Sequence, residues 1–189
     1  MKIEWIEKLK ARLETTIDLA QGKNNAAVLV PIGNRPDTTF PSILLTKRTD
    51  KVETHKGQIS FPGGFYEQGD ENILKTALRE AYEEVGLEEN QIQVLGCLKP
   101  VKTLGEVVIY PWVAKVDFPE TFHLSIEEVE KTLFLPLDRL LREGLELVEV
   151  PVKGSGPTLY INSLAMEFEG ELVWGASAKI LNQLYQALK

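Results

Sequence analysis

The chain has 189 residues, of which 43% are hydrophobic and 26% are charged, as in ordinary folded domains. Its net charge of −7 argues against nucleic acid as a partner, its apolar runs are too short to span a bilayer, and its one cysteine, Cys97, excludes an internal disulfide and a thiolate metal cluster. We therefore expect a single domain over residues 1–189, located in the cytoplasm, that binds neither nucleic acid nor membranes.

The first half of the chain alternates predicted strands with two predicted helices. Apolar residues recur at helical spacing near the N-terminus and predict a helix over residues 3–20, within an N-terminal segment 1–22. Asp70 is predicted to cap a second helix over residues 71–85, and Gly86 to follow its end. Short apolar runs before the second helix predict strands over residues 26–32, 42–48 and 59–61.

The second half of the chain is rich in predicted strands. Residues 92–101 and 106–117 are typical of a long hairpin, and a polar turn is expected over residues 125–131. A short helix opened by proline is predicted over residues 136–143, and a closing helix over residues 176–188. Further short strands are predicted over residues 132–135, 147–152, 158–161, 165–168 and 171–174. This pattern favours one α+β domain with a mixed sheet between helices.

Three carboxylates crowd the second predicted helix, because Glu80, Glu83 and Glu84 lie within five residues. On a helical wheel of about 100° per residue they occupy one arc, beside an apolar side that is expected to face the core. Like charges four residues apart cost about a few tenths of a kcal/mol, so the arrangement is unfavourable unless a cation lies among them. Hard divalent ions such as Mg²⁺ take oxygen ligands of this kind and often share them with substrate phosphates.

Two neighbours of the carboxylates support the metal interpretation. The turn Pro62-Gly63-Gly64 precedes the helix, and glycine permits a close backbone approach, so the Gly64 carbonyl can lie beside the carboxylates. Arg79 stands four residues before Glu83 and is expected to pair with it. The alternative is a solvated acidic helix face, which is common and which the helix alone would favour.

These residues resemble the signature of the Nudix hydrolase family, G-x5-E-x7-R-E-(apolar)-x-E-E-x-G-(apolar). Gly64 corresponds to its first glycine, and REAYEEVGL, residues 79–87, matches its end without a mismatch. The segment between is one residue longer than the signature, so the first acid is either Asp70 or Glu71. The resemblance implies a Nudix-type α/β/α sandwich with a mixed β-sheet between helices.

The upstream segment is similar to the coenzyme A diphosphatase branch of that family, whose pattern is LLTxR[S/A]x3Rx3Gx3FPGG. The stretch LLTKRTDKVETHKGQISFPGG, residues 44–64, matches it in register through Arg48, Gly57 and Phe61. It departs at Thr49, where the branch has Ser or Ala, and at Glu53, which reverses the charge of an Arg. Glu53 is the residue that favours a different diphosphate substrate.

The resemblance implies hydrolysis of a diphosphate that depends on Mg²⁺ or Mn²⁺. For coenzyme A, the products would be 3′,5′-ADP and 4′-phosphopantetheine. Glu80, Glu83 and Glu84 match the metal ligands of the family. We expect the Gly64 carbonyl to complete the metal site, since it follows the Pro-Gly break.

The catalytic candidates are Glu83, Glu84 and Arg79. Glu83 is a metal ligand that can also orient the attacking water, and Arg79 can hold Glu83 in place. A carboxylate is needed to accept a proton from that water. The general base stays open between Glu83 and the two acids of the later polar turn, Glu127 and Glu128.

The substrate-binding candidates are Arg48, His55, Gly57 and Phe61. Arg48 is a cation in an acidic protein, and we expect it to contact an anionic substrate rather than to form only a surface ion pair. For His55, which precedes the Gly57 turn, a phosphate contact and an ordinary surface role are equal alternatives.

Two other functions compete with coenzyme A hydrolysis. The first keeps the chemistry and changes the substrate to ADP-ribose, a nucleotide sugar or a dinucleoside polyphosphate. The second is a non-catalytic Nudix-fold module that senses a nucleotide, which a degraded carboxylate set would favour; here the set is intact. The expected partner is a small-molecule diphosphate, and a homodimer is one alternative for the oligomeric state.

Overall fold

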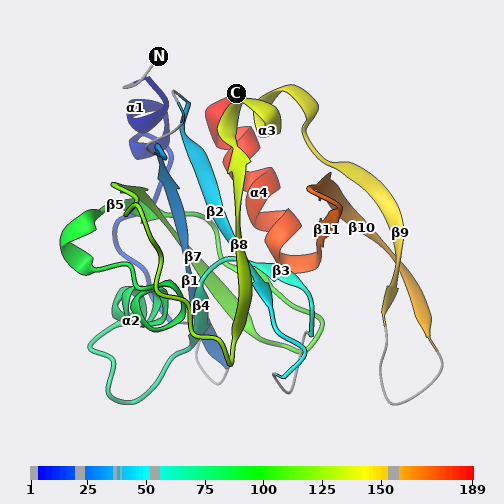
Figure 1. Cartoon of the computed structure of the whole chain (residues 1–189), viewed down its shortest axis with the longest axis horizontal. Helices are drawn as coiled ribbons and strands as arrows, with labels where there is room; N and C mark the ends of the chain where they lie inside the picture. Colours follow the sequence, from blue (N-terminus) through cyan, green and yellow to red (C-terminus); the bar gives the residue numbers. More distant parts are fainter. Residues whose placement is uncertain (1–3, 20–23, 36–37, 39, 52–55, 153–157) are drawn as a thin grey trace.

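The computed structural model describes residues 4–19, 24–35, 38, 40–51, 56–152 and 158–189 of the chain (Figure 1). The helices are α1 (Glu4–Lys10), α2 (Ile73–Val85), α3 (Leu137–Glu143) and α4 (Gly175–Leu188), with a 3₁₀ turn at Glu89–Gln91. The strands are β1 (Asn25–Gly33), β2 (Ser42–Arg48), β3 (Ile59–Ser60), β4 (Gly63–Phe65), β5 (Ile92–Cys97), β6 (Val101–Lys102), β7 (Val108–Val116), β8 (Val129–Pro136), β9 (Glu146–Val152), β10 (Leu159–Phe168) and β11 (Glu171–Trp174). No helix in these ranges is long and apolar enough to cross a bilayer.

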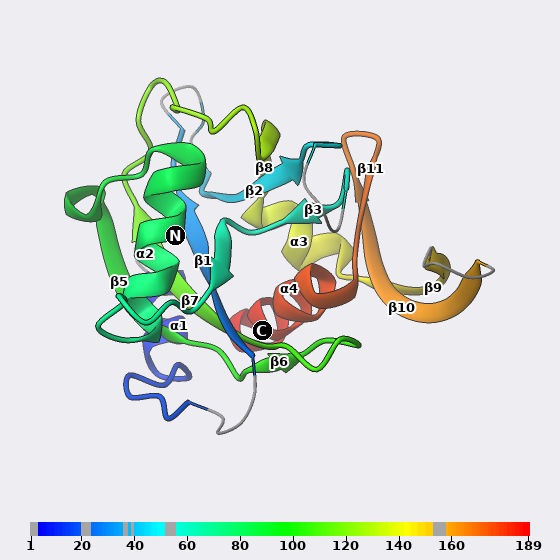
Figure 2. The ribbon, with the colours of Figure 1, turned by 90° about the horizontal axis from the view of Figure 1, so that it is seen from below.

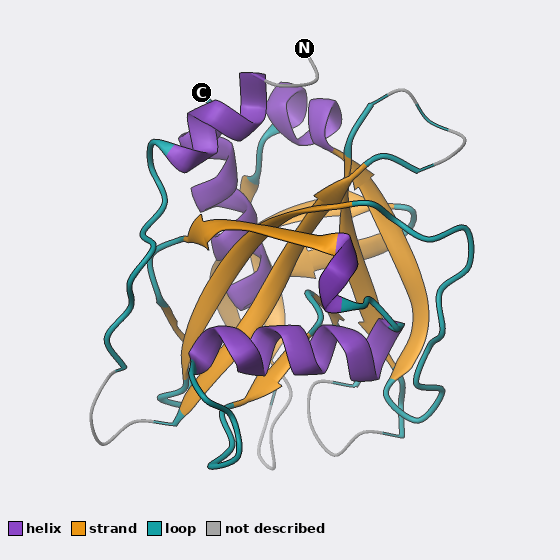
Figure 3. Cartoon of the chain, turned by 90° about the vertical axis from the view of Figure 1, so that its left-hand side faces the viewer, coloured by secondary structure: helices purple, strands orange, loops and turns teal. Residues whose placement is uncertain are grey.

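The main sheet is mixed and lies between helices. Its central path runs β3-β2-β1-β7-β5, while β4 pairs with β1, β6 with β7 and β8 with β2. Strands β1 and β7 are parallel, and the other strand pairs in the described chain are antiparallel. Helix α2 packs on one face, and α1, α3 and α4 pack on the other (Figures 1 and 3). The predicted α+β class with a mixed sheet between helices is confirmed.

Helix α2 buries the apolar stripe that its sequence predicts. Ala77, Ala81 and Val85 are fully buried against the sheet, and Leu78 is nearly so. The helix ends at Gly86, whose φ of 73° is a left-handed conformation that glycine adopts at little cost. Its partners in the core include Leu29, Leu44 and Trp112 from the central strands. The carboxylates of α2 are thereby held at a fixed height above the sheet.

The predicted cap of this helix is wrong by two residues. Helix α2 begins at Ile73, and the side chain of Asn72 caps it by accepting a hydrogen bond from the Lys75 amide at 3.0 Å. Asp70 does not cap the helix because its carboxylate binds the Arg79 guanidinium, at 3.0 and 3.2 Å. A backbone amide is a weaker attraction for a carboxylate than a guanidinium.

The N-terminal prediction is also wrong beyond Lys10, where α1 ends. The guanidinium of Arg12 donates to the carbonyls of Gln186 and Ala187 at the end of α4, at 2.8 and 3.1 Å. Glu14 then forms a two-way backbone bridge with Cys97 of β5. The segment leaves the helix because it covers the edge of the sheet, and the two ends of the described chain lie side by side (Figure 1).

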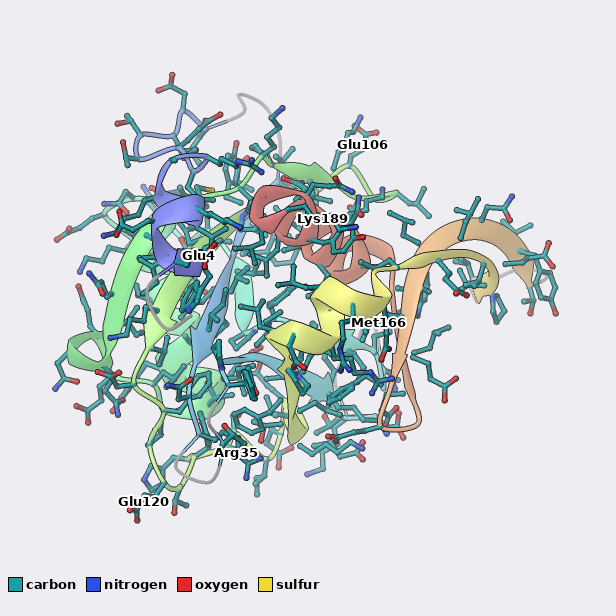
Figure 4. The ribbon with its side chains drawn as sticks, turned by 90° about the horizontal axis from the view of Figure 1, so that it is seen from above. Glu4, Arg35, Glu106, Glu120, Met166 and Lys189 are labelled. Carbon is teal, nitrogen blue, oxygen red and sulfur yellow. The ribbon has the colours of Figure 1, made fainter. Side chains whose placement is uncertain are left out.

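A second, three-stranded sheet of order β11-β10-β9 projects from the body as an arm (Figure 2). The two strands predicted over residues 158–161 and 165–168 are one strand, β10, because β9 pairs with it without interruption. Met166 of β10 is 6% exposed and lies where the arm joins the body (Figure 4). Glu171 ties the arm to the main sheet through Lys47 at 3.0 Å and Lys131 at 2.8 Å.

The turn expected over residues 125–131 is shorter than predicted, because β8 already begins at Val129 and runs to Pro136. Pairing of β8 with β2 extends the strand beyond the predicted residues 132–135. The turn proper comprises residues 126–128. This shorter turn stands over the carboxyl end of α2, since the amide of Ser125 donates to the Glu84 carbonyl at 3.0 Å.

Candidate active site

The turn Pro62-Gly63-Gly64 and helix α2 meet over strand β1, as the sequence predicts. Strand β4 pairs antiparallel with β1, so that Gly63 lies opposite Val28 and Gly64 opposite Ala27. A Cβ atom on Gly64 would stand 2.3 Å from Oε1 of Glu80, which is inside any real contact distance. A side chain at residue 64 would therefore displace the Glu80 carboxylate from its present position, and glycine leaves it in place.

Glu84 is a buried carboxylate, with a side chain that is 2% exposed. Burial raises its pKa to about 8; the Arg48 guanidinium opposes this rise, whereas the charges of Glu80 and Glu128 add to it. Oε1 lies 3.5 Å from Nη1 of Arg48, and the Gly63 amide donates to the carboxylate. Oε2 is buried and has no hydrogen-bond partner among the described residues. Such an oxygen is costly to bury unless something else satisfies it.

Glu80 and Glu83 flank Arg79 and differ in exposure. The side chain of Glu80 is 14% exposed, that of Glu83 is 53% exposed, and both accept a hydrogen bond from Nη1 of Arg79, at 2.8 and 3.1 Å. The predicted pairing of Arg79 with Glu83 is thus present. Burial raises the pKa of Glu80, the Arg79 cation lowers it, and the neighbouring Glu83 and Glu128 charges raise it again.

Arg79 is the centre of an ion network that reaches beyond the predicted pair. It donates to both oxygens of Asp70, from Nε at 3.0 Å and from Nη2 at 3.2 Å, and Nη2 also donates to the Phe65 carbonyl at 3.2 Å. Asp70 is further held by the hydroxyl of Thr76 at 2.8 Å. Of the two acids left open, Asp70 contacts Arg79, whereas Glu71 is exposed. The resemblance pointed to an acid here, but nothing in the local pattern indicated its partner.

The Asp70–Arg79 pair predicts an acid-dependent loss of stability. Hydrogen bonding to Arg79, against a smaller effect of burial, lowers the pKa of Asp70 from an ordinary value of 3.8 to about 2. The folded state binds the proton less readily than the unfolded chain, so the stabilisation is present above about pH 4 and disappears as the pH falls through about 2. Asp70→Asn should lower the free energy of unfolding by about 1–2 kcal/mol at pH 6 in urea titrations.

The difference in free energy of unfolding between wild type and Asp70→Asn should become smaller as the pH is lowered from 6 to 3. Asp117→Asn is the matched control, because its carboxylate is 86% exposed and its only described ion pair, with Lys115, spans 3.7 Å. A difference that stays constant over this pH range would mean that the Asp70 charge does not provide the stabilisation.

Arg48 is aimed at the site by an irregularity in the sheet. The register between β2 and β8 shifts between Lys47 and Arg48, which is the signature of a β-bulge. Lys47 points to the arm, where it pairs with Glu171, and Arg48 points to Glu84. Nε of Arg48 is buried without a hydrogen-bond partner in the described chain. The prediction placed Arg48 near the site, and its present partner is a carboxylate.

Of the other three predicted substrate-binding residues, the structure describes Gly57 and Phe61. Gly57 has a φ of 65°, and its amide donates to the Arg48 carbonyl at 3.2 Å, so it closes the loop that follows β2. Phe61 is 2% exposed and its side chain packs in the hydrophobic core, so a substrate contact at this position stays a prediction. His55 lies outside the described residues.

The polar turn separates two acids that the sequence could not distinguish. Glu127 is exposed and pairs with Lys51 at 2.9 Å, and its charge is not among those that shift the pKa of Glu80 or Glu84. Glu128 is half-buried, and its charge raises the pKa of both Glu80 and Glu84. Glu128 therefore belongs to the carboxylate cluster, whereas Glu127 does not.

The donor set can be compared with the needs of a divalent ion. Across residues 4–19, 24–35, 38, 40–51, 56–152 and 158–189, no three His, Cys, Asp or Glu side chains already converge as a metal-binding group. The partly buried Glu80 and the buried Glu84 nevertheless repel each other, and Glu84 has an unsatisfied oxygen. Oxygen donors in this state fit Mg²⁺ or Mn²⁺, once Glu83 turns from Arg79.

Comparison with known proteins decides the family. The sequence profile of the NUDIX domain matches residues 23–152, which span the main sheet, α2 and the polar turn. The chain belongs to the Nudix family. Nudix hydrolases generally use divalent metal ions, and membership supports hydrolysis of nucleoside diphosphate-linked substrates in general.

Curated Nudix relatives resemble the chain over nearly its whole length. An uncharacterized Nudix hydrolase NudL from Yersinia enterocolitica is 33% identical over 184 residues, which cover 97% of this chain and 91% of the relative. Its namesake from Photorhabdus laumondii is 34% identical over 172 residues, covering 90% and 88%. The similarity therefore extends beyond the conserved domain core to both ends of the chain.

Solved Nudix structures share the fold at low sequence identity. An Ap4A hydrolase from C. elegans superimposes with a TM-score of 0.51 at 21% identity, covering 62% of this chain and 83% of that one. The NUDIX domain of Shewanella oneidensis NrtR, solved with ADP ribose, gives 0.51 at 19% identity, covering 65% and 79%. A MutT/nudix family protein from Enterococcus faecalis gives 0.55 at 14% identity, covering 92% and 70%.

Proposed function

We propose that this Nudix protein hydrolyses coenzyme A to 3′,5′-ADP and 4′-phosphopantetheine, with Mg²⁺ or Mn²⁺ as its metal ion. The observation that carries the hydrolytic proposal is the buried Glu84, paired with Arg48 and left with one unsatisfied oxygen beside Glu80. The coenzyme A assignment rests on the upstream segment 44–64, which matches the pattern of that branch at Arg48, Gly57 and Phe61.

Glu80, Glu83 and Glu84 would hold the ion, with the Gly64 carbonyl beside them. When bound, a divalent ion neutralises phosphate charge and lowers the pKa of water at the site. Glu84 would supply charge from a buried position and Glu80 from a partly buried one, and Glu84 is further constrained by the Gly63 amide. Arg79 holds Glu80 and Glu83 side by side through Nη1, and Glu83 would leave this bond to reach the ion.

Substrate recognition would use the loop around Arg48. Its guanidinium is 23% exposed and already faces the carboxylate cluster, so a diphosphate that enters the site meets a cation beside the acids. The Gly57 amide donates to the Arg48 carbonyl, and the Arg48 amide donates to the Gln58 carbonyl, so these bonds hold the neck of the loop. His55 is proposed to reach a phosphate from the same loop. A guanidinium suits phosphate because its planar donors can bond two oxygens.

We infer that Glu128 rather than Glu127 is the general base, with Glu83 as the remaining alternative, because the charge of Glu128 acts on Glu80 and Glu84. Glu128→Gln should lower kcat about a hundredfold, because a positioned carboxylate accepts the proton of the attacking water. The adjacent Glu127→Gln is the matched control and should stay within about twofold of wild type, since Glu127 pairs with Lys51 away from the cluster. Steady-state kinetics with the two variants checks this. If kcat fell equally in Glu128→Gln and Glu127→Gln, Glu128 would not be the general base in preference to Glu127.

A second candidate keeps the reaction and changes the substrate. Glu53 stands where the coenzyme A branch has an Arg, and this charge reversal favours a less anionic diphosphate such as ADP-ribose or a nucleotide sugar. Dinucleoside polyphosphates belong to the same alternative. The relatives of known structure include an Ap4A hydrolase and a domain bound to ADP ribose, although their low identity supports the fold alone.

A product assay by mass spectrometry separates these candidates. Coenzyme A, ADP-ribose, ADP-glucose and diadenosine polyphosphates are incubated with Mg²⁺ or Mn²⁺, with Glu84→Gln as the blank. The highest kcat/KM for coenzyme A, with 3′,5′-ADP as a product, would support the proposal. A higher kcat/KM for another diphosphate would support Nudix hydrolysis and exclude coenzyme A as the preferred substrate. Binding without cleavage of any compound would favour the non-catalytic sensor.

A further inference from the structure

Thr49 joins strand β2 to the turn that carries Glu128. It lies directly after β2, and its side chain is buried. Its hydroxyl donates to the Glu127 carbonyl at 2.7 Å, and its amide donates to the Glu128 carbonyl at 2.9 Å. One residue therefore fixes two successive carbonyls of the turn.

These two bonds restrict the direction in which the Glu128 side chain leaves the backbone. The carbonyl of Glu127 belongs to the peptide plane before the Glu128 Cα, and the carbonyl of Glu128 belongs to the plane after it. Peptide groups are planar, so two fixed planes leave the φ and ψ of the residue between them little freedom. The direction of the Cα–Cβ bond follows from these angles.

The other side of the turn is fixed as well. The amides of Glu128 and Val129 donate to the Ser125 carbonyl at 3.0 and 2.7 Å, and the Ser125 amide donates to the Glu84 carbonyl at 3.0 Å. The turn is thus anchored on α2 at one end and on Thr49 at the other. The anchor through Thr49 includes a side chain, so it can be removed by substitution.

We propose that Thr49 is a positioning residue that directs the carboxylate of Glu128 toward the reacting water of the hydrolytic site. The proposal rests on the function proposed above, with Glu128 as the base. A residue of this kind affects turnover through another side chain, because small displacements of a catalytic group have large effects on rate. It requires no contact between Thr49 and the substrate.

The test compares five variants, including Glu128→Gln alone, with wild type on the substrate that wild type cleaves best. Thr49→Val keeps the shape and loses the hydroxyl; it should lower kcat about tenfold and leave KM within about twofold. Thr49→Ser, which restores the donor, should recover most of the loss. Thr49→Val in the Glu128→Gln background should cost nothing more, because the group that Thr49 positions is already gone. Thr46→Val is the control.

Thr46 suits this purpose because it lies on the same strand, is 1% exposed, and gives its hydroxyl to Ser60 instead of the turn. Its loss should leave kcat within about twofold of wild type. A Thr49→Val enzyme with wild-type kcat would overturn the proposal. So would a Thr49→Val effect that is equally large with and without Glu128, since the hydroxyl would then act on something else.

Amide hydrogen exchange gives a readout that does not depend on turnover. The amides of Glu128 and Val129 should exchange at least about tenfold faster in Thr49→Val than in wild type, and Thr49→Ser should restore their protection. If the exchange rates did not change, Thr49 would not hold the turn through its hydroxyl (the clamp), even if activity fell. A wild-type protein that cleaves none of the diphosphates would remove the proposed function and the catalytic role of Thr49 with it, whereas the exchange data would still show whether the clamp exists.

Discussion

Glu84→Gln is expected to reduce kcat at least about a thousandfold while leaving the fold intact. The substitution keeps the shape of the side chain and removes its charge. Glu84 is the most deeply buried of the three carboxylates, at 2% exposure, and it faces both Arg48 and the Gly63 amide. An uncharged amide cannot replace a carboxylate as a ligand of a hard divalent ion. Steady-state kinetics with saturating Mg²⁺, and far-UV circular dichroism for the fold, check this expectation.

The same substitution should stabilise the metal-free protein at alkaline pH. Burial raises the pKa of Glu84 to about 8 from an ordinary value of 4.5, so the folded state binds its proton more tightly than the unfolded chain does. The stability of wild type therefore falls as the pH rises from about 4.5 to about 8, and then levels off. Glu84→Gln removes this dependence. Above pH 8 its Tm should exceed that of wild type by about 4 °C or more.

Metal binding gives the complementary result. Mg²⁺ should raise the Tm of wild type, and more so at pH 8 than at pH 6, because a bound ion requires the ionised carboxylate. It should not raise the Tm of Glu84→Gln. Glu89→Gln is the control, since Glu89 is exposed and pairs with Lys75 outside the cluster. If Glu84→Gln retained near-parental activity, or if Mg²⁺ stabilised it as it does wild type, Glu84 would not be a metal ligand.

The sequence predicted those helices and strands whose apolar residues form a clear local pattern. Strand β2 and the stripe of α2 follow directly from the spacing of their apolar residues, and Gly86 ends α2 because its backbone conformation suits glycine. The meeting of Gly64 with Glu80 was also predictable, since a single short loop connects them. In these cases the residues that interact are near each other in sequence.

Contacts between distant residues were not predictable in the same way. The chain after Lys10 leaves its helix because Glu14 bridges Cys97, and nothing within the segment itself indicates that partner. Glu127 and Glu128 are chemically identical neighbours, and backbone bonds from residues distant in sequence, Thr49 and Glu84, hold the turn that sets their different environments. Asp70 lies beside a competing cap at Asn72, which explains why helix-start rules alone misplace it.

Arg79→Met is expected to lower the free energy of unfolding by about 3 kcal/mol and the Tm by about 6–12 °C. Methionine keeps much of the volume of the side-chain stem but supplies none of its donors. Arg79 serves Asp70, Glu80 and Glu83 at once, with donor–acceptor distances of 2.8 to 3.2 Å. Its loss leaves Asp70, whose side chain is 6% exposed, as a buried charge without a cation. Activity should fall at least about a hundredfold, because Glu80 loses its orientation.

The companion variant distinguishes loss of a cation from loss of packing. Adding Asp70→Asn to Arg79→Met removes the stranded charge, so the double variant should be more stable than Arg79→Met alone, although Asp70→Asn by itself destabilises wild type. Arg142→Met is the control: its guanidinium is 69% exposed and pairs with Asp138 at 3.3 Å, so the Tm should change little. Chemical denaturation of the four proteins at pH 7 measures the coupling. If the losses from Asp70→Asn and Arg79→Met simply added, Arg79 would stabilise the site by packing, and the ion network would not be what holds α2 and the loop before it together.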